Sequence, residues 1–152
     1  MSFHVVFLIK LIDESLILGA SNMVDRYWSG TIWYHTNVVN FDRNQHAAAI
    51  KTESGVREAI YLGKHDKFII GEDSGMLQIF EIVLNPTTHT QEMQCLGYSC
   101  QHDDSISSIC RFENNDLIVT AGMDSWYSFL FVVNILCRSL YDMSIAVKCI
   151  IK

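Results

Sequence analysis

The chain has 152 residues, of which 49% are hydrophobic and 18% charged, a composition typical of one globular domain and not of a disordered chain. Its net charge of -6 argues against nucleic acid as a direct partner, because nucleic-acid-binding surfaces are basic, and an acidic body favours basic partners. Five cysteines, an odd number without the spacing of a disulfide scaffold, favour a reducing compartment, either cytoplasm or nucleus.

Apolar runs separated by polar turns predict short strands in the first fifty residues. Residues 3–12 are rich in β-branched and aromatic side chains and fit a strand better than a short helix. No basic residue precedes this run and no small-residue cleavage site follows promptly, so we expect no signal peptide. Further strands are expected at 15–20 and 31–35, with a polar loop at 21–28 between them. Residues 37–52 lack helix caps and apolar periodicity and are expected to form a loop.

Residues 52–124 contain one pattern twice: a strand, a second strand ending in Gly-x-Asp-Ser, and a polar connection. The first copy predicts strands at 56–62, 67–70 and 76–83, with a tight turn at 71–75. The second copy predicts strands at 106–112 and 117–121, with a turn at 114–116 and the second Gly-x-Asp-Ser at 122–125. Gly71 and Gly122 are 51 residues apart, Val56 and Ile106 are 50 apart, and a trace of an earlier copy at 29–33 precedes 74–78 by 45 residues.

Repeats of this length that hold short strands are typical of propeller blades, because one small sheet cannot bury both of its faces alone. Residues 92–100, after the turn that contains Pro86, should form the outer strand of the first full blade. A closed propeller needs about 4 to 8 blades, and this chain holds about three at the repeat length seen here. The sequence therefore predicts an all-β, incomplete propeller whose open edges would hinder folding as a monomer.

The pattern breaks after Asp124, since the third strand expected there is not apparent in the apolar segment that follows. Residues 126–137 are apolar but too short to span a bilayer as a helix. Three interpretations compete: a divergent strand pair, an amphipathic or membrane-seeking tail, and an extension that arises from alternative splicing or an unspliced gene model. The third is preferred because the blade pattern is kept up to Asp124 and then lost, which divides the chain into residues 1–125 and 126–152.

Four strings resemble the WD-repeat family of β-propellers, and more closely its methylosome subunit, the WD-repeat partner of the type II protein arginine methyltransferase. They are LILGASN followed by RYWSGTIW, KTESGVREAIYLG, GEDSGMLQIFEI, and YSCQHDDSISSI with IVTAGMDS, within residues 16–125. Phe80 and Glu81 stand where the name-giving Trp-Asp pair would be. The resemblance implies a partial WD-repeat β-propeller, about two and a half to three blades of a seven-bladed ring, from the N-terminal part of such a protein.

The resemblance also implies a non-catalytic adaptor without cofactor, which docks on the methyltransferase and helps present arginine-rich substrates such as Sm proteins and histones. It implies a place in the cytoplasm and nucleus and neither nucleic acid nor membrane as a direct partner. It further implies that the loop carrying Trp28 inserts into the enzyme's barrel domain with help from Arg26. From the residues alone, Trp28 either plugs the edge of the fold or anchors a partner, since Trp and Arg are common interface anchors. The alternatives are a generic WD-repeat interaction module and a non-functional truncated product.

Structural roles are expected for the polar residues near the two Gly-x-Asp-Ser strings. Asp73 and Asp124 should close tight turns, where a carboxylate accepts local backbone N–H groups and the nearby glycine relaxes the backbone. His102, Thr120 and Asp124 fall where WD-repeat blades build a buried chain of hydrogen bonds that normally ends on a tryptophan of the third strand. Trp126 follows Asp124 too closely to take that place.

Catalysis and metal binding are weaker interpretations. A hydrolase around Asp73 and Ser74, or around residues 102–104, would need a nucleophile with an oriented base, and no companion motif supplies one. Possible zinc ligands are Cys95, Cys100, His102 and Cys110, but their spacing differs from the paired knuckles of structural zinc sites. We therefore expect neither an enzyme nor a metal site. A membrane-tethered product through the apolar tail is a third alternative.

Overall fold

A computed structural model describes residues 4–10, 14–24, 27–39, 41–42, 44–63, 66–100, 102–112, 117–133 and 136–139. Within these ranges the chain forms twelve β-strands and no helix. The strands are β1 (His4–Lys10), β2 (Leu16–Val24), β3 (Tyr27–His35), β4 (Ala48–Thr52), β5 (Val56–Tyr61), β6 (Lys67–Glu72), β7 (Met76–Leu84), β8 (Gln91–Cys100), β9 (Ile106–Phe112), β10 (Leu117–Gly122), β11 (Tyr127–Val133) and β12 (Leu136–Ser139). The turn predicted at 114–116 lies outside the described residues.

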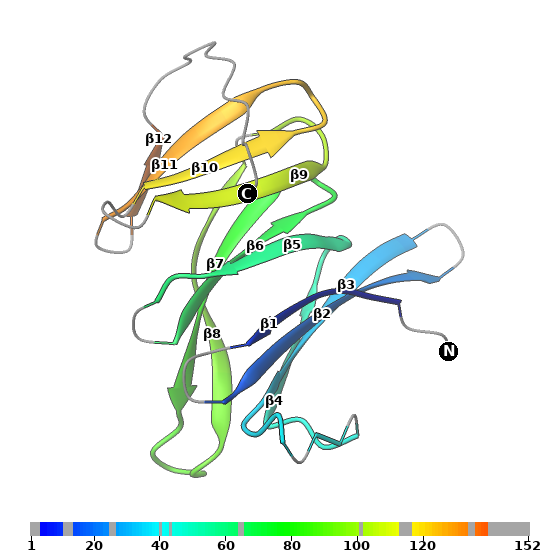
Figure 1. Cartoon of the computed structure of the whole chain (residues 1–152), viewed down its shortest axis with the longest axis vertical. Helices are drawn as coiled ribbons and strands as arrows, with labels where there is room; N and C mark the ends of the chain where they lie inside the picture. Colours follow the sequence, from blue (N-terminus) through cyan, green and yellow to red (C-terminus); the bar gives the residue numbers. More distant parts are fainter. Residues whose placement is uncertain are drawn as a thin grey trace.

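The strands form three four-stranded antiparallel sheets, and within each sheet every strand pairs with its neighbours in sequence. We call them blade 1 (β1–β4), blade 2 (β5–β8) and blade 3 (β9–β12). The first strand of blade 2, β5, contacts both β1 and β9, so the first strands of the three blades lie next to one another. Figure 1 shows the three twisted sheets side by side. This arrangement confirms the prediction of an incomplete β-propeller.

Three sequence predictions about elements were wrong. Residues 48–52 form β4 and not a loop, because they pair with β3 from Gly30 to Tyr34. Residues 21–24 and 27–28 extend β2 and β3 where a polar loop was predicted. The third strand that was not apparent after Asp124 is present as β11, and β12 pairs with it. The chain thus continues as a strand pair to Ser139, while the origin of the tail stays a prediction.

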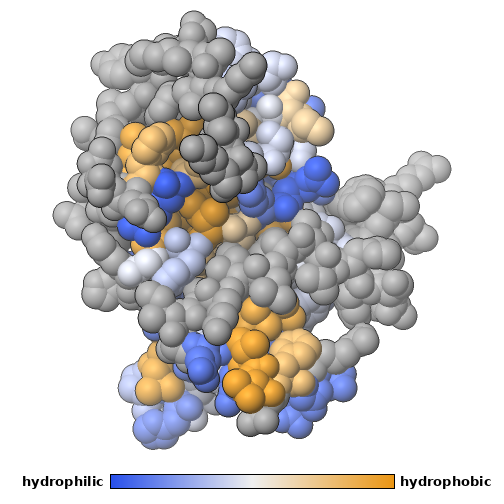
Figure 2. All heavy atoms as spheres, viewed as in Figure 1, coloured by the Kyte–Doolittle hydropathy of each residue, from blue (hydrophilic) through white to orange (hydrophobic). Residues whose placement is uncertain are grey.

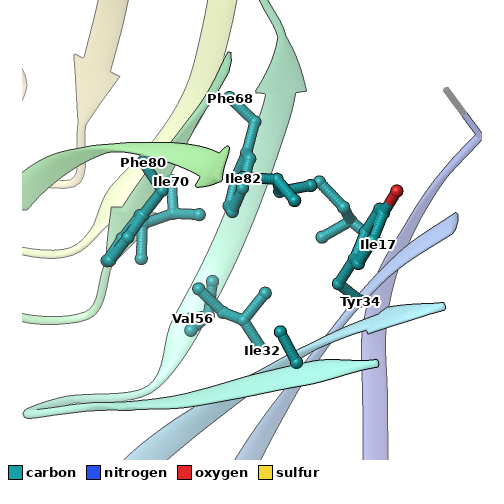
Figure 3. Close-up of a cluster of buried hydrophobic side chains, with 9 residues drawn as sticks. Ile17, Ile32, Tyr34, Val56, Phe68, Ile70, Phe80 and Ile82 are labelled. Atoms are coloured by element: carbon teal, nitrogen blue, oxygen red, sulfur yellow. The ribbon is translucent and has the colours of Figure 1, made fainter. Parts of the chain in front are cut away.

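The core between blades 1 and 2 forms because alternate residues of β6 and β7 point to the same side. Phe68 and Phe80 stack there with ring centroids 5.5 Å apart and an angle of 20° between the rings. The other members of this buried cluster are Ile17, Ile32, Tyr34, Ala48, Val56, Ile70 and Ile82. Figure 3 shows the side chains of the two blades pointing toward one another.

The intervening residues of the same strands build a second core, between blades 2 and 3. It contains Leu62, Ile69, Leu77 and Ile79 of blade 2, and Ile106, Ile109 and Ile118 of blade 3. Since successive residues of a strand point to opposite faces, Phe68 and Ile70 lie in the first core while Ile69 lies in the second. Blade 2 is therefore covered on both faces, as the stacking of small sheets requires.

Candidate functional site

Each blade has one corner that joins its second strand to its third, and the three corners align through the strand pairing. A β-bulge interrupts the first strand of every blade at the same place. The residue of the second strand that pairs just after the bulge is Gly19 in blade 1, Gly71 in blade 2 and Ala121 in blade 3. These residues pair in turn with Ile32, Leu77 and Tyr127 of the third strands. The corners between these pairs are residues 20–31, 72–76 and 122–126. The blade 1 corner is therefore seven residues longer than the other two.

The extra residues of the blade 1 corner form a two-stranded hairpin. Pairing between β2 and β3 continues without a break from Ile32 back to Tyr27, which pairs with Val24. Trp28 lies on the β3 side of this hairpin, opposite Met23. Arg26 lies outside the described residues. Figure 1 shows β2 and β3 reaching the right-hand edge of the molecule, so a predicted partner-binding residue stands on its longest projecting corner.

His102 of blade 3 lies between Thr120 and Asp124. Its Nε2 is 2.9 Å from Thr120 Oγ1, and its Nδ1 is 3.2 Å from each carboxylate oxygen of Asp124. A carboxylate can only accept, so Nδ1–H donates to Asp124, and in the neutral ring Nε2 accepts from the Thr120 hydroxyl. Asp124 also accepts from the backbone N–H groups of Asp103 at 2.9 Å and Trp126 at 3.0 Å. The corner is thereby tied to the connection that leads into β9.

These contacts set the charge state of Asp124. Burial raises the pKa of this carboxyl group, but hydrogen bonds from the Trp126 and Asp103 amides and from His102 outweigh it and hold the pKa below 3.8. The acid therefore remains ionised at neutral pH. Gly122 makes room for this arrangement, because a Cβ there would collide with the His102 ring and the Asp124 carboxylate.

The two Gly-x-Asp-Ser strings occupy the same corner of adjacent blades but are out of register by one residue. Glu72 pairs with Val56 as Gly122 pairs with Ile106. Each residue of the blade 2 corner therefore has a counterpart in blade 3: Glu72 matches Gly122, Asp73 matches Met123, Ser74 matches Asp124, Gly75 matches Ser125, and Met76 matches Trp126. The left-handed residues agree with this alignment, with φ of 80° at Gly75 and 69° at Ser125. The prediction that Gly71 and Gly122 relax the backbone was wrong, since neither has a positive φ.

In blade 2 the residue that joins the corner to the incoming connection is Glu72, which is fully buried. One of its oxygens accepts from the Ser54 backbone N–H at 3.2 Å and from the Ser54 hydroxyl at 2.7 Å, and the other accepts from the Gln78 amide. Burial raises the pKa of Glu72 more than the hydrogen bonds from Ser54 and Gln78 lower it. Ser54 precedes β5 as Asp103 precedes β9, so a carboxylate of the corner fastens the incoming connection in both blades. Sequence reasoning missed Glu72, which is adjacent to the predicted Asp73.

Asp73 bridges blades 2 and 3. Its Oδ1 accepts from the Ser105 hydroxyl at 3.0 Å and lies 3.4 Å from Arg57 Nε, while its backbone N–H donates to Gly55 O at 2.8 Å. The carboxylate was predicted to accept from local backbone N–H groups. The contacts that the structure gives it instead run to other segments, so Asp73 acts between connections and not within its own turn.

The alternative chemistries gain no support from the described residues. The hydrogen bonds of Ser74 join it to Ser54, at 3.1 Å between hydroxyls and 3.2 Å from its backbone N–H. Cys95 and Cys100 are exposed free thiols. In the part of the chain that the structure describes, no three His, Cys, Asp or Glu side chains are grouped to hold a metal ion. The same residues include no helix with the length and apolar character of a membrane span.

The three meander sheets and their repeated bulge and corner define the chain as a partial β-propeller. No family model matches the chain. A curated relative, "Methylosome protein WDR77" of Xenopus laevis, is 24% identical over 113 residues, which are 74% of this chain and 32% of the relative. The chain thus spans about a third of the length of that relative.

Proposed function

We propose that the chain is a non-catalytic adaptor of a methylosome, which docks on a type II protein arginine methyltransferase and helps present arginine-rich substrates such as Sm proteins and histones. Its relative is named as a methylosome protein, and the similarity covers 74% of this chain. A net charge of -6 suits basic substrates. The proposal places the adaptor in the cytoplasm and nucleus.

The observation that carries the proposal is the seven-residue extension of the blade 1 corner. A projecting hairpin can enter a recess of a partner while the stacked sheets stay rigid. In this proposal Trp28 on β3 anchors the methyltransferase, with Arg26 assisting. Large aromatic and arginine side chains are the usual centres of binding energy in interfaces.

Co-expression with the methyltransferase tests the proposal. The chain should co-purify with the enzyme, and Trp28→Ala should weaken the association by about 2 kcal/mol or more, the range of an interface anchor. Tyr98→Ala, at an exposed aromatic residue of blade 2, is the control and should leave the association unchanged. Equal retention of the Trp28→Ala variant and the unmodified chain would remove the hairpin from the interface.

A further inference from the structure

The corner of blade 3 presents large side chains to solvent. Met123 is 60% exposed, Trp126 54% and Tyr127 39%. Asp103 and Asp104, in the connection that leads into β9, are exposed as well. Neither the blade cores nor the hairpin of blade 1 uses these five residues.

The two acidic residues are held directly beside the aromatic corner. The backbone N–H groups of Asp103 and Trp126 donate to the two oxygens of one carboxylate, that of Asp124, at 2.9 and 3.0 Å. The backbone N–H of Met123 donates to Ser105 O at 2.8 Å, which joins the same two segments a second time. Trp126 and Asp103 are thus positioned together before any partner arrives.

The charges of Asp103 and Asp104 are not neutralised within the part of the chain that the structure describes. Among the described residues, Arg57 pairs with Asp73 and Lys67 with Glu81, and neither Asp103 nor Asp104 takes part in these ion pairs. Figure 2 shows hydrophobic and hydrophilic residues interspersed on the face of the molecule seen in Figure 1.

We propose that this aromatic–acidic corner, formed by Asp103, Asp104, Met123 and Trp126, binds an arginine-bearing extended segment of a partner protein. A guanidinium group is planar and weakly hydrated, so it can stack on an indole ring while its N–H groups donate to a carboxylate. The exposed indole of Trp126 and the exposed carboxylates of Asp103 and Asp104, on two segments joined by backbone hydrogen bonds, supply both parts. The inference deepens the proposed function by naming where an arginine-rich substrate would be held, and the identity of that substrate rests on the proposed function.

An open groove between blades 1 and 2 is an alternative candidate for a binding site. It has a volume of about 490 Å³ and is lined by Lys51, Thr52, Glu53, Met76, Gln78 and Tyr98. Lys51 and Glu53 carry opposite charges, so the groove shows no preference for a cation or an anion. Tyr98, which is 71% exposed, provides a control aromatic residue away from the blade 3 corner.

Binding of a labelled arginine–glycine repeat peptide to the full chain tests the inference by fluorescence anisotropy. A peptide of the same length with citrulline in place of arginine has no charge and should bind at least about tenfold more weakly, a difference of about 1.4 kcal/mol. Trp126→Ala should weaken binding of the arginine peptide about fivefold, as expected for a lost cation–π contact. Asp103→Asn with Asp104→Asn should weaken it as well and reduce its dependence on salt. Tyr98→Ala should bind as the unmodified chain does.

Three outcomes would overturn the inference. The first is equal affinity for the arginine and citrulline peptides, and the second is unchanged affinity in the Trp126→Ala variant. The third is self-association of the chain that Trp126→Ala abolishes, since the corner would then be a contact between two copies. Co-purification with the methyltransferase is measured separately with Trp28→Ala. Failure of the unmodified chain to co-purify would therefore contradict the proposed function and leave the peptide site standing, whereas loss of association in the Trp28→Ala variant is the expected result.

Discussion

The backbone N–H of Ile109 in β9 donates to the Glu58 carboxylate of β5, with the two atoms 2.6 Å apart. The first strand of a blade has a free edge, and here the neighbouring blade satisfies one of its N–H groups. Burial raises the pKa of Glu58, although hydrogen bonds from Ile109 and Ser108 lower it. Two carboxyl groups with raised pKa, Glu58 and Glu72, thus lie at the joins between segments.

The first prediction concerns the dependence of stability on pH. Because the folded state binds the protons of Glu58 and Glu72 more tightly than the unfolded state does, their contribution is present below pH 4.5 and is lost as the pH rises through the raised pKa values. Replacing both by Gln should therefore flatten the fall in unfolding free energy between about pH 4.5 and 7. Denaturant titrations over this range measure it, with exposed Glu92→Gln as the control. Parallel pH profiles for the double variant and the unmodified chain would contradict the assignment.

The second prediction concerns the position with a positive φ that the corners of blades 2 and 3 share, which is Gly75 in blade 2 and Ser125 in blade 3. Gly75→Ser should lower the unfolding free energy by at least about 1–2 kcal/mol, because an L residue is strained there. A Cβ at this position would also meet the backbone oxygen of Asp104 at 2.8 Å. Ser125→Gly, the reverse change at the matching position, should raise stability by about 0.5 kcal/mol, since relief of strain exceeds the added entropy of the unfolded chain. Changes of the same sign in the two variants would show that the corners are not equivalent.

The third prediction concerns the buried hydrogen bonds of His102. Thr120→Val should cost about 1–3 kcal/mol, because it leaves a buried ring nitrogen without a partner. His102→Ala should cost at least as much, and the double variant should cost less than the sum of the two. Thermal and denaturant unfolding measure these values, with the exposed His46→Ala as control. Strict additivity would mean that the two side chains do not interact.

The fourth prediction concerns Phe80, which stands where the WD-repeat resemblance places tryptophan. It is 1% exposed and stacks on Phe68. Phe80→Ala should lower the unfolding free energy by about 3–5 kcal/mol through the cavity left between blades 1 and 2. Leu84→Ala, on the same strand and 62% exposed, should change it by less than about 0.5 kcal/mol. Similar losses in both variants would argue against a tight join between these blades.

Regular alternation of apolar and polar residues made the strands of the two repeat copies predictable from the sequence. Strands β5, β7, β8 and β9 fall close to the expected ranges. Strand β4 was missed because alanines have low strand propensity, and its pairing with β3 decides its conformation. The hairpin that carries Trp28 was read as a loop for a similar reason, since polar residues there pair across the hairpin. In both segments, pairing with a neighbouring strand outweighs local preference.

The candidate site was only partly predictable. The positions of His102, Thr120 and Asp124 could be proposed from the resemblance to WD-repeat blades, and the structure brings these three side chains together. Glu72 could not be found in this way, because a charged residue rarely points inward and its partner Ser54 lies eighteen residues earlier. The repeated string Gly-x-Asp-Ser also suggested a register that the strand pairing shifts by one residue.

The ties that Glu72 and Asp124 make have a consequence for how such a chain can be lengthened or shortened. Each tie joins the connection after an outer strand to a corner of the following sheet, as Ser54 to Glu72 and Asp103 to Asp124. A cut between sheets would separate these partners, whereas a cut after a third strand keeps them in one piece. The unit that keeps both hydrogen-bonded partners together is therefore β4 with β5–β7, or β8 with β9–β11.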